Sequence, residues 1–381
     1  MSARPRILHL HSTFDLGGKE ARAVRLMNAF GGNARHAIVS SIPDALGARA
    51  AIDPAIEVDF PTDVPLAGRP SPGRLRRLAG YFSRFDLLLS YNWGAVDAVM
   101  ARRLFGGPPL IHHEDGFNED EIARQNPTRV VWRRLALPAA QRLIVPSHVL
   151  ENIAKSIWRQ PSERINYIAN GIAVDRFAGE PEREAIPGFY RAPDEIVVGT
   201  LAGLRAVKNL PRLVRAFAAA SRTIPRPMRL VIVGEGADRA RILAMATEEG
   251  VADRLLMPGF LADPARYIGH FDIFALSSDS EQAPISLVEA MAAGLPVVAT
   301  AVGDVVSMVS AVNSAFIVRA GDEAGFAEAI TRVAASDAVR ARLGAANRRH
   351  ASEHFREEGM IAAYRLAYSA ALGDEMALGR P

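Results

Sequence analysis

Two glutamates, Glu281 and Glu289, stand eight positions apart in a segment whose pattern suits a phosphate flanked by hydroxyl groups. Glu281 follows an apolar run, Pro284 marks a helix start and Gly294 marks its end. The amides of a helix N-terminus attract phosphate, and carboxylates accept hydrogen bonds from hydroxyls. A nucleotide sugar presents these groups. Taken without its context, the same pair also fits a capped surface helix with two solvated glutamates.

Two cationic residues, Arg205 and Lys208, suit the diphosphate of such a ligand. A guanidinium offers a planar fork and an ammonium a point charge, so together they can neutralise a departing diphosphate without a metal ion. Lys208 is one of only three lysines in the chain, against 42 arginines. A solvated helix start is the alternative interpretation of both residues.

Two segments nearer the N-terminus also carry candidate groups. Gly17 and Gly18 precede a helical pattern and leave room for a ligand close to the backbone, although a plain tight turn fits equally well. His112 and His113 end a strand-like run, followed by Glu114 and Asp115. Because neighbouring strand residues point to opposite faces, only one of the two histidines can face a ligand.

Strands that alternate with helices must position these residues. The first half has strand-like runs at 6–11, 36–41, 87–90, 109–112 and 142–146. After an irregular stretch at 171–194, they resume at 196–200, 229–233, 255–257, 272–276, 296–300 and 315–318. This alternation predicts an α/β protein with two doubly wound lobes facing a cleft, and ligands at the carboxyl ends of the strands.

Composition restricts the function classes further. The chain has 381 residues, 49% of them apolar, and a net charge of +3, which is too small to indicate a nucleic-acid partner. It has no cysteine, so disulfides and thiolate chemistry are excluded. No apolar run is long enough for a membrane span or a signal peptide. We therefore expect a cytoplasmic protein without a metal or other cofactor.

Two basic amphipathic stretches stand apart from the candidate site. Arg74, Arg76, Arg77 and Arg84 alternate with apolar and aromatic residues, and a second stretch covers 132–135. Such stretches can rest on anionic lipid headgroups, which predicts peripheral contact with the inner face of a membrane. The alternative is a helix packed on its lobe with a solvated basic face.

The segment from Glu289 to Thr300, EAMAAGLPVVAT, resembles the family 4 retaining glycosyltransferases (glycosyl transferases group 1). Other landmarks of that family follow in order along nearly the whole chain. They are Gly17-Gly18-Lys19-Glu20, Asn170-Gly171-Ile172, the loop from Thr200 to Asn209, Val231–Gly236 and Pro258-Gly259-Phe260. The resemblance implies the GT-B architecture, with an acceptor-side lobe over 1–175, a donor-binding lobe over 176–356 and a C-terminal helix over about 357–381 that returns to the first lobe.

The resemblance also implies roles for single residues. Glu289 would bind the ribose, Glu281 the sugar hydroxyls, and Arg205 and Lys208 the diphosphate. A histidine near the reacting sugar corresponds to His113, whereas another common form of the motif places Asp115 there. The remaining donor-binding positions implied are Gly17, Gly18, Gly203, Gly259, Phe260, Pro284, Ile285 and Ser286.

The implied reaction transfers a hexosyl group from a UDP- or GDP-linked sugar to a glycan or a lipid-linked acceptor, in cell-envelope or exopolysaccharide synthesis. Two alternatives stay open: a nucleotide-sugar 2-epimerase with the same architecture, and a non-catalytic nucleotide-sugar-binding protein. The family usually has a glutamate after a Val-Gly-Gly turn. Here Val302-Gly303-Asp304 is followed by Ser307 near that place, a departure that keeps altered donor handling or lost activity among the alternatives.

Overall fold

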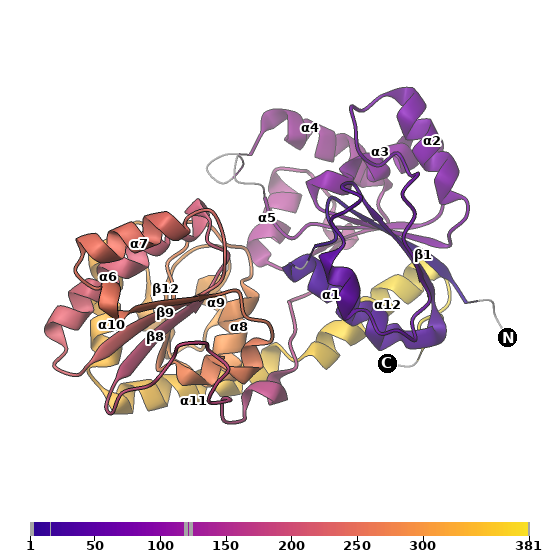
Figure 1. Ribbon diagram of the computed structural model, residues 1–381. Coiled ribbons are helices and arrows are strands. Elements are labelled where there is room, and N and C mark those ends of the chain that lie inside the picture. Colours follow the sequence, from indigo (N-terminus) through magenta and orange to yellow (C-terminus); the bar gives the residue numbers. More distant parts are fainter. Residues whose placement is uncertain (1–3, 16, 118–120, 122–124, 380–381) are drawn as a thin grey trace. The chain divides into compact units, whose positions relative to one another are not determined.

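The computed structural model describes residues 4–15, 17–117, 121 and 125–379, and it consists of two compact units (Figure 1). The first comprises Met1–Asn170 and Glu358–Pro381, and the second comprises Gly171–Glu357. The boundary between the two units therefore lies after Asn170, and not after residue 175 as the sequence analysis expects. Each unit is an α/β structure built on a parallel sheet, as predicted.

The first unit contains a seven-stranded parallel sheet in the order β3-β2-β1-β4-β5-β6-β7. Its central strands are buried on both faces, which explains their almost uninterrupted apolar sequences. The strands are β1 (Arg6–His11), β2 (Arg35–Ser40), β3 (Val58–Asp59), β4 (Leu87–Tyr91), β5 (Leu110–His113), β6 (Arg142–Val145) and β7 (Ile165–Tyr167).

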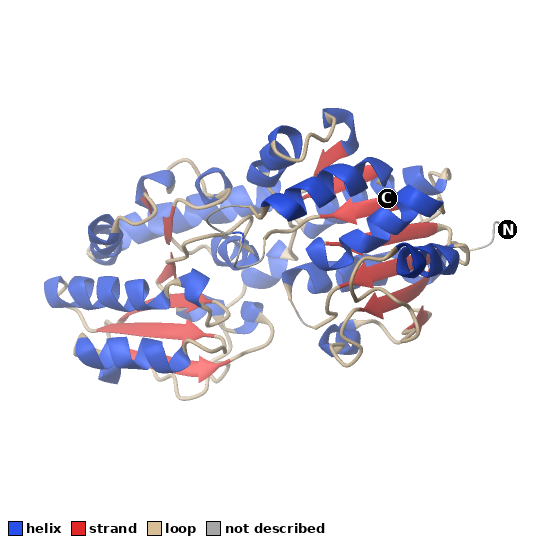
Figure 2. Ribbon diagram, turned by 90° about the horizontal axis from the view of Figure 1, so that it is seen from above, coloured by secondary structure: helices blue, strands red, loops and turns tan. Residues whose placement is uncertain are grey.

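Helices cover both faces of this sheet (Figure 2). Alternate residues of the strands face two separate cores, one shared with α1 (Gly18–Phe30) and α12 (Glu357–Leu372), the other with α2 (Pro72–Phe82) and α3 (Val96–Phe105). The face of α2 and α3 also carries α4 (Pro127–Ala136) and α5 (His148–Ser156). Ser71, Asn126 and Ser147 cap α2, α4 and α5 with their side chains, which fixes where these helices begin.

The second unit contains a six-stranded parallel sheet in the order β10-β9-β8-β11-β12-β13. Its strands are β8 (Ile196–Leu201), β9 (Met228–Val233), β10 (Leu255–Gly259), β11 (Ile273–Leu276), β12 (Val297–Thr300) and β13 (Ile317–Val318). Its helices are α6 (Leu210–Thr223), α7 (Arg239–Glu248), α8 (Ile285–Ala292), α9 (Val305–Met308), α10 (Glu323–Ala334) and α11 (Asp337–His354). The core between the sheet and α6, α7 and α10 consists almost entirely of fully buried apolar side chains.

None of the helices in the described ranges combines the length and apolar character needed to cross a membrane.

Candidate active site

The strand order of the second unit reverses between β8 and β11, which lie side by side. The chain passes from β8 to β9 and β10 on one side, and then to β11, β12 and β13 on the other. Open parallel sheets bind ligands outside the carboxyl ends of their strands at such a point. Arg205 and Lys208 follow β8, and Glu281 follows β11. The structure therefore brings these three predicted residues to the same end of adjacent strands.

Lys208 and Glu281 form an ion pair at this place. The Nζ atom of Lys208 lies 2.5 Å from Oε1 of Glu281, and the Ser278 hydroxyl donates to the same oxygen at 2.7 Å. The side chains are 17% and 10% exposed, respectively. The ammonium is thus held in a partly dry environment but stays within reach of a ligand. An anion next to Lys208 and a hydroxyl next to Glu281 would be bound side by side.

Hydrogen bonds between the two loops that carry this ion pair hold them together. The Ser277 hydroxyl donates to the carbonyl oxygen of Lys208 at 2.9 Å, and the amide of Asp279 donates to that of Val207 at 2.8 Å. Asn209 caps α6 in the left-handed conformation, with φ of 42°, and its side-chain amide donates to Asp279 at 3.0 Å. The charged groups are therefore positioned before any ligand arrives, which lowers the reorganisation that binding requires.

Two glycines permit the close approach of these loops. Gly303 has φ of 54°, and a Cβ atom there would lie 2.3 Å from the carbonyl oxygen of Glu281. Gly234 has φ of 144°, and a Cβ atom would lie 1.9 Å from the carbonyl oxygen of Ala202. A side chain at either position would push a site loop away, so the chain requires glycine there.

Arg205 is exposed next to Gly203 and has no carboxylate within ion-pair distance among the described residues. Helix α8 begins at Ile285 after Pro284, and no described side chain caps it. Ser286 lies in its first turn. The uncapped amides and the unpaired guanidinium are both donors suited to a phosphate.

The other predicted donor-binding residues lie on the same end of the sheet. Glu289 is half-buried on α8. The pKa of Tyr267 is raised above its usual value, first by the burial of Tyr267 itself and then by the negative charge of Glu289. Gly259 ends β10 with φ of 93°, and its carbonyl oxygen accepts from the amide of Gly234 at 2.8 Å. Phe260 follows with an exposed ring. Within the described residues, no group of three or more histidine, aspartate or glutamate side chains could hold a metal ion.

In the first unit, Gly17 and Gly18 lie where β1 leads into α1, at the carboxyl end of the sheet. Gly17 caps α1 without a side-chain hydrogen bond, and a Cβ atom at Gly17 would lie 2.8 Å from Oε2 of Glu20. Lys19 contacts Glu20, and burial lowers the pKa of Lys19 to about 8. The glycine loop thus packs against a charged pair formed by the two residues that follow Gly18 in the predicted landmark.

His113, which the sequence analysis expects near the reacting sugar, is the last residue of β5. Its ring is fully buried in the first unit. The Tyr368 hydroxyl of α12 lies 2.8 Å from Nε2, and the carbonyl oxygen of Ser90 lies 3.2 Å from Nδ1. Since a carbonyl only accepts, Nδ1 carries the proton and Nε2 accepts from Tyr368. Burial lowers the pKa of His113 to about 3. Nε2 therefore links the strand to α12, and Nδ1 donates to the neighbouring strand β4.

Asp115 lies two residues beyond His113 and is 15% exposed. Arg22 holds its carboxylate through two contacts of 2.5 and 2.8 Å, and donates to the side-chain oxygen of Asn170 at 3.0 Å. Burial acts to raise the pKa of Asp115, but the Arg22 charge and hydrogen bonds hold it below its usual range. The alternative form of the family motif, which puts Asp115 in the place of the histidine, therefore names a charged, part-buried group that is paired with Arg22.

The basic stretches do not form a uniformly solvated face, because the structure buries two of their arginines. Arg74 pairs with Asp97, and Arg133 lies between Glu114 and Glu121 with nitrogen–oxygen distances of 3.2 Å. A buried guanidinium is tolerated because these carboxylates neutralise it. The acidic partners of Arg133 are 12 and 19 residues away in sequence, so helical periodicity gave no signal of the pairing.

Comparison with known proteins places both units in one family. The model of Glycosyltransferase Family 4 matches residues 16–176, and the model of Glycosyl transferases group 1 matches residues 182–350. Among curated relatives, a D-inositol 3-phosphate glycosyltransferase of Saccharomonospora viridis is 28% identical over 70% of this chain and 66% of its own. An N-acetyl-alpha-D-glucosaminyl L-malate synthase of Bacillus anthracis is 26% identical over 74% of this chain and 73% of its own. The chain thus spans about two thirds to three quarters of these relatives' length.

Solved structures share the fold. Sucrose-phosphate synthase of Thermosynechococcus elongatus superposes with a TM-score of 0.77 and 21% identity, covering 97% of this chain and 99% of the other. HepE of Anabaena, solved in complex with UDP-glucose, superposes with a TM-score of 0.78 and 20% identity, covering 96% of this chain and 100% of the other. These likenesses show that the chain has the GT-B type of Rossmann-like units. The two family models, which leave only the chain ends and a short connector unmatched, show that the chain belongs to the family 4 glycosyltransferases of glycosyl transferases group 1.

Proposed function

We propose that this protein is a retaining glycosyltransferase that transfers a hexosyl group from a UDP- or GDP-linked sugar without a metal ion. The acceptor is a glycan or a lipid-linked saccharide of cell-envelope or exopolysaccharide synthesis. The observation that carries the proposal is the Lys208–Glu281 ion pair at the strand reversal, beside Arg205 and the uncapped start of α8. The complex of HepE with UDP-glucose supports the class of donor.

Each group has a distinct role in this proposal. Lys208 and Arg205 bind the diphosphate and stabilise the charge that grows on it as the glycosidic bond breaks. Glu281 accepts a hydrogen bond from a sugar hydroxyl, and Glu289 from the ribose. The backbone amides of Ile285 and Ser286, which follow Pro284 at the start of α8, donate to the phosphate. Gly203, Gly259 and Phe260 border the nucleotide.

The configuration of the anomeric carbon is retained if the acceptor oxygen attacks that carbon on the face from which the diphosphate leaves. The bond from that carbon to the phosphate oxygen breaks as the bond to the acceptor forms. The departing phosphate oxygen takes the acceptor proton, so no protein base is needed. Lys208 and Arg205 stabilise the negative charge that develops on the diphosphate as the bond breaks, before the acceptor proton neutralises it.

The acceptor of a second candidate reaction is a small anion. The two named relatives act, by their names, on inositol 3-phosphate and on L-malate, both of which carry negative charge. In the first unit, Lys19 is part-buried near the carboxyl ends of the strands, and its pKa of about 8 keeps it cationic at neutral pH. A soluble phosphorylated or carboxylated alcohol is therefore the second class of acceptor to be tested.

Donor turnover should not depend on a divalent metal ion, because Lys208, Arg205 and helix amides supply the positive charge. UDP- and GDP-sugars would be screened by thermal shift, since a ligand at 100 times its Kd adds about 2.7 kcal/mol of stability. The selected donor is then assayed with acceptors in EDTA, and release of nucleoside diphosphate is measured. Loss of turnover that Mg²⁺ or Mn²⁺ restores would contradict the roles of these groups. If the donor sugar is epimerised but not transferred, the protein is the 2-epimerase. If the donor binds and no reaction follows, the protein is the non-catalytic binding protein.

Asp115→Asn should lower kcat by about 10²-fold with little change in donor KM, because we propose that this carboxylate, rather than His113, meets the reacting sugar. His113→Ala should mainly lower thermal stability, since its ring holds α12. Asp115→Glu, which keeps the charge next to Arg22, separates a folding defect from a catalytic one. If the His113→Ala variant is well folded but inactive while Asp115→Asn is active, His113 rather than Asp115 contacts the reacting sugar.

A further inference from the structure

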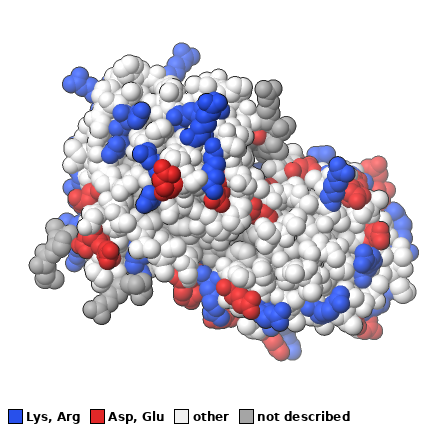
Figure 3. Space-filling view, turned by 180° about the vertical axis from the view of Figure 1, so that it is seen from behind, with Lys and Arg blue, Asp and Glu red and all other residues white. Residues whose placement is uncertain are grey.

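Arg22 of α1 is a buried cation of the first unit. Figure 3 shows lysines, arginines and acids at the surface of one face of the protein, whereas the Arg22 side chain is only 4% exposed. A guanidinium loses its hydration on burial, and partners of opposite charge must offset that cost. The role of Arg22 therefore follows from the groups that surround it.

The main partner of Arg22 is the carboxylate of Asp115, which follows β5. The two terminal nitrogens of Arg22 each donate to one carboxylate oxygen, at 2.5 and 2.8 Å. This two-pronged contact fixes the plane of the carboxylate. One of the same nitrogens donates to the side-chain oxygen of Asn170, the last residue of the unit, at 3.0 Å. Arg22 thus joins three segments that lie 93 and 148 positions away along the chain.

Neighbouring groups confine both members of this ion pair. The backbone amide of Asp115 donates to the side-chain oxygen of Asn92 at 2.7 Å, and Asn92 itself has a left-handed φ of 55°. The guanidinium of Arg22 lies over the ring of Tyr364 of α12, 5.5 Å from its centre. The carboxylate is therefore held through its backbone and through both of its oxygens.

Titratable groups of four elements face the Asp115 carboxylate: Lys19 and Arg22 of α1, Tyr91 of β4, His113 of β5 and Tyr364 of α12. Burial keeps the last three neutral, because it raises the pKa of both tyrosines and lowers the pKa of His113 to about 3. Lys19 is cationic, but it is paired with Glu20. Arg22 is thus the main charge that opposes the effect of burial on Asp115.

The ion pair leaves Asp115 able to act on a substrate. A carboxylate has about four acceptor sites, and the two contacts with Arg22 occupy one on each oxygen. The Asp115 side chain is 15% exposed, so part of it can still be reached. An ionised carboxylate there can accept from a sugar hydroxyl and stabilise positive charge that develops on the sugar as its bond to the diphosphate breaks.

We propose that Arg22 is a positioning residue of the transfer reaction: it orients the Asp115 carboxylate toward the reacting sugar and keeps it charged. This inference rests on the proposed function, and it assigns Arg22 no contact with a substrate. Arg22→Lys keeps a positive charge but loses the planar fork, whereas Arg22→Gln loses the charge. The two variants therefore separate the orientation of Asp115 from its ionisation.

Arg22→Gln should lower kcat by about 10- to 10²-fold with little change in donor KM, because the carboxylate is no longer held in place. Without the guanidinium, burial raises the pKa of Asp115, so the acid limb of kcat against pH should move to higher pH. Arg22→Lys should recover part of kcat and keep the acid limb near its original place. A purely structural role would lower stability without moving the pH profile.

A double-mutant cycle tests whether Arg22 acts only through Asp115. In the Asp115→Asn background, Arg22→Lys should cause no further loss of kcat. This comparison also decides the matter if Arg22→Gln fails to fold. Losses that multiply, or an acid limb that stays in place in a folded Arg22→Gln, would overturn the proposal.

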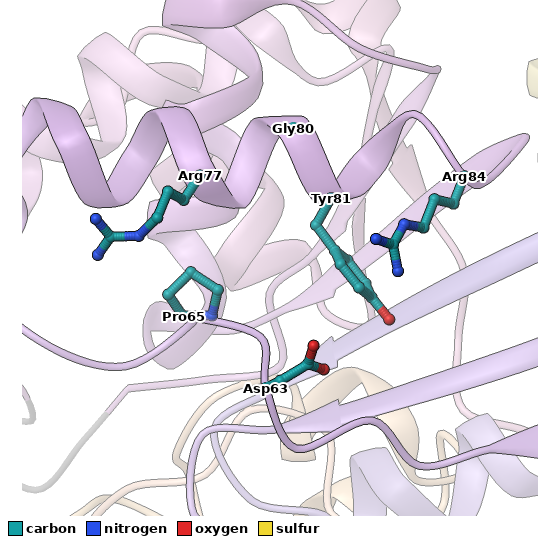
Figure 4. A pocket seen from close by; sticks show the side chains of 6 residues that line it. All are labelled: Asp63, Pro65, Arg77, Gly80, Tyr81 and Arg84. Carbon is teal, nitrogen blue, oxygen red and sulfur yellow. The ribbon is translucent and has the colours of Figure 1, made fainter.

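Arg84→Lys is the matched control. Arg84 is an exposed arginine of the first unit whose guanidinium also lies over a tyrosine ring, 4.9 Å from the centre of Tyr81, beside a pocket of about 320 Å³ (Figure 4). Asp115 is not among the residues that line this pocket. Turnover and its pH profile should therefore be unchanged in Arg84→Lys.

The charge of Asp115 can also be followed without any substrate. In protein labelled with ¹³C-aspartate, the carboxyl signal that is lost in Asp115→Asn belongs to Asp115. That signal should begin to titrate at least about one pH unit higher in Arg22→Gln than in the unaltered protein. Equal titration in both would overturn the proposal. If the signals behave as expected but the unaltered protein transfers no sugar, the transferase proposal fails, and what stands is the control of the Asp115 charge by Arg22.

Discussion

Lys208→Met should lower kcat by about 10²- to 10³-fold, the loss expected when a pre-positioned charge is removed from a developing anion. The effect is large because Lys208 is held in place before the donor binds. Its ammonium pairs with Glu281 at 2.5 Å, and its carbonyl oxygen accepts from Ser277. Methionine keeps much of the side-chain volume and removes the charge. The Glu281 carboxylate then stays part-buried without its cation, so donor KM should rise as well.

Lys155→Met is the matched control for this experiment. Lys155 is a second of the three lysines and also pairs with a glutamate, Glu151, but its side chain is exposed on α5. An exposed ion pair contributes little to stability. Single-turnover measurements at saturating donor would isolate the chemical step, and calorimetry with the bare nucleoside diphosphate would report diphosphate binding. Near-normal turnover of Lys208→Met would remove Lys208 from the proposed mechanism.

The second unit was predictable from sequence because its site is local. Pro284 and Gly294 mark the ends of α8 within one short segment, and the loops after β8 and β11 have few residues. Parallel-sheet topology alone then brings Arg205, Lys208 and Glu281 together. What the sequence did not reveal is how the loops are fastened. The contacts of Ser277 with Lys208 and of Asn209 with Asp279 join residues about 70 positions apart.

The first unit was less predictable because distant segments decide which groups are exposed. Strand alternation correctly separated His112 from His113, but it could not say which side of the sheet is covered. Helix α12, 255 residues later in sequence, covers His113 through Tyr368. Asp115 stays partly exposed because it follows the end of β5. Periodicity predicts to which side of the sheet a strand residue points, whereas its exposure depends on which elements pack on that side.

The first unit should lose its stability in mild acid, well before the second. Four histidines in its sheet, His9, His11, His36 and His113, are buried and neutral. His9 and His36 share a hydrogen bond of 3.0 Å, whereas neither nitrogen of His11 has a hydrogen-bond partner among the described residues. Burial lowers the pKa of all four, to about 4 for His36 and about 3 for His113.

The direction of the effect follows from proton binding. Between each lowered pKa and about 6.5, the unfolded chain binds a proton that the folded unit does not. The stability of these neutral histidines is therefore fully present above pH 6.5 and declines as the pH falls. Each histidine costs about 1.4 kcal/mol per pH unit within its own interval. A domain typically has only about 5–15 kcal/mol of stability, so several such histidines are expected to unfold the first unit in mild acid.

The chain's three tryptophans, Trp93, Trp132 and Trp158, all belong to the first unit, so their fluorescence reports on that unit alone. Tryptophan fluorescence should change at a higher pH than the main loss of far-ultraviolet circular dichroism, to which the second unit also contributes. Urea unfolding followed by fluorescence at several pH values gives the slope directly. His36→Gln should reduce that slope by about 1.4 kcal/mol per pH unit, whatever it does to stability at neutral pH. His354→Gln, at an exposed position of the second unit, should leave it unchanged. A fluorescence-detected stability that stays constant from pH 7 to 5 would contradict the buried, neutral state of these histidines.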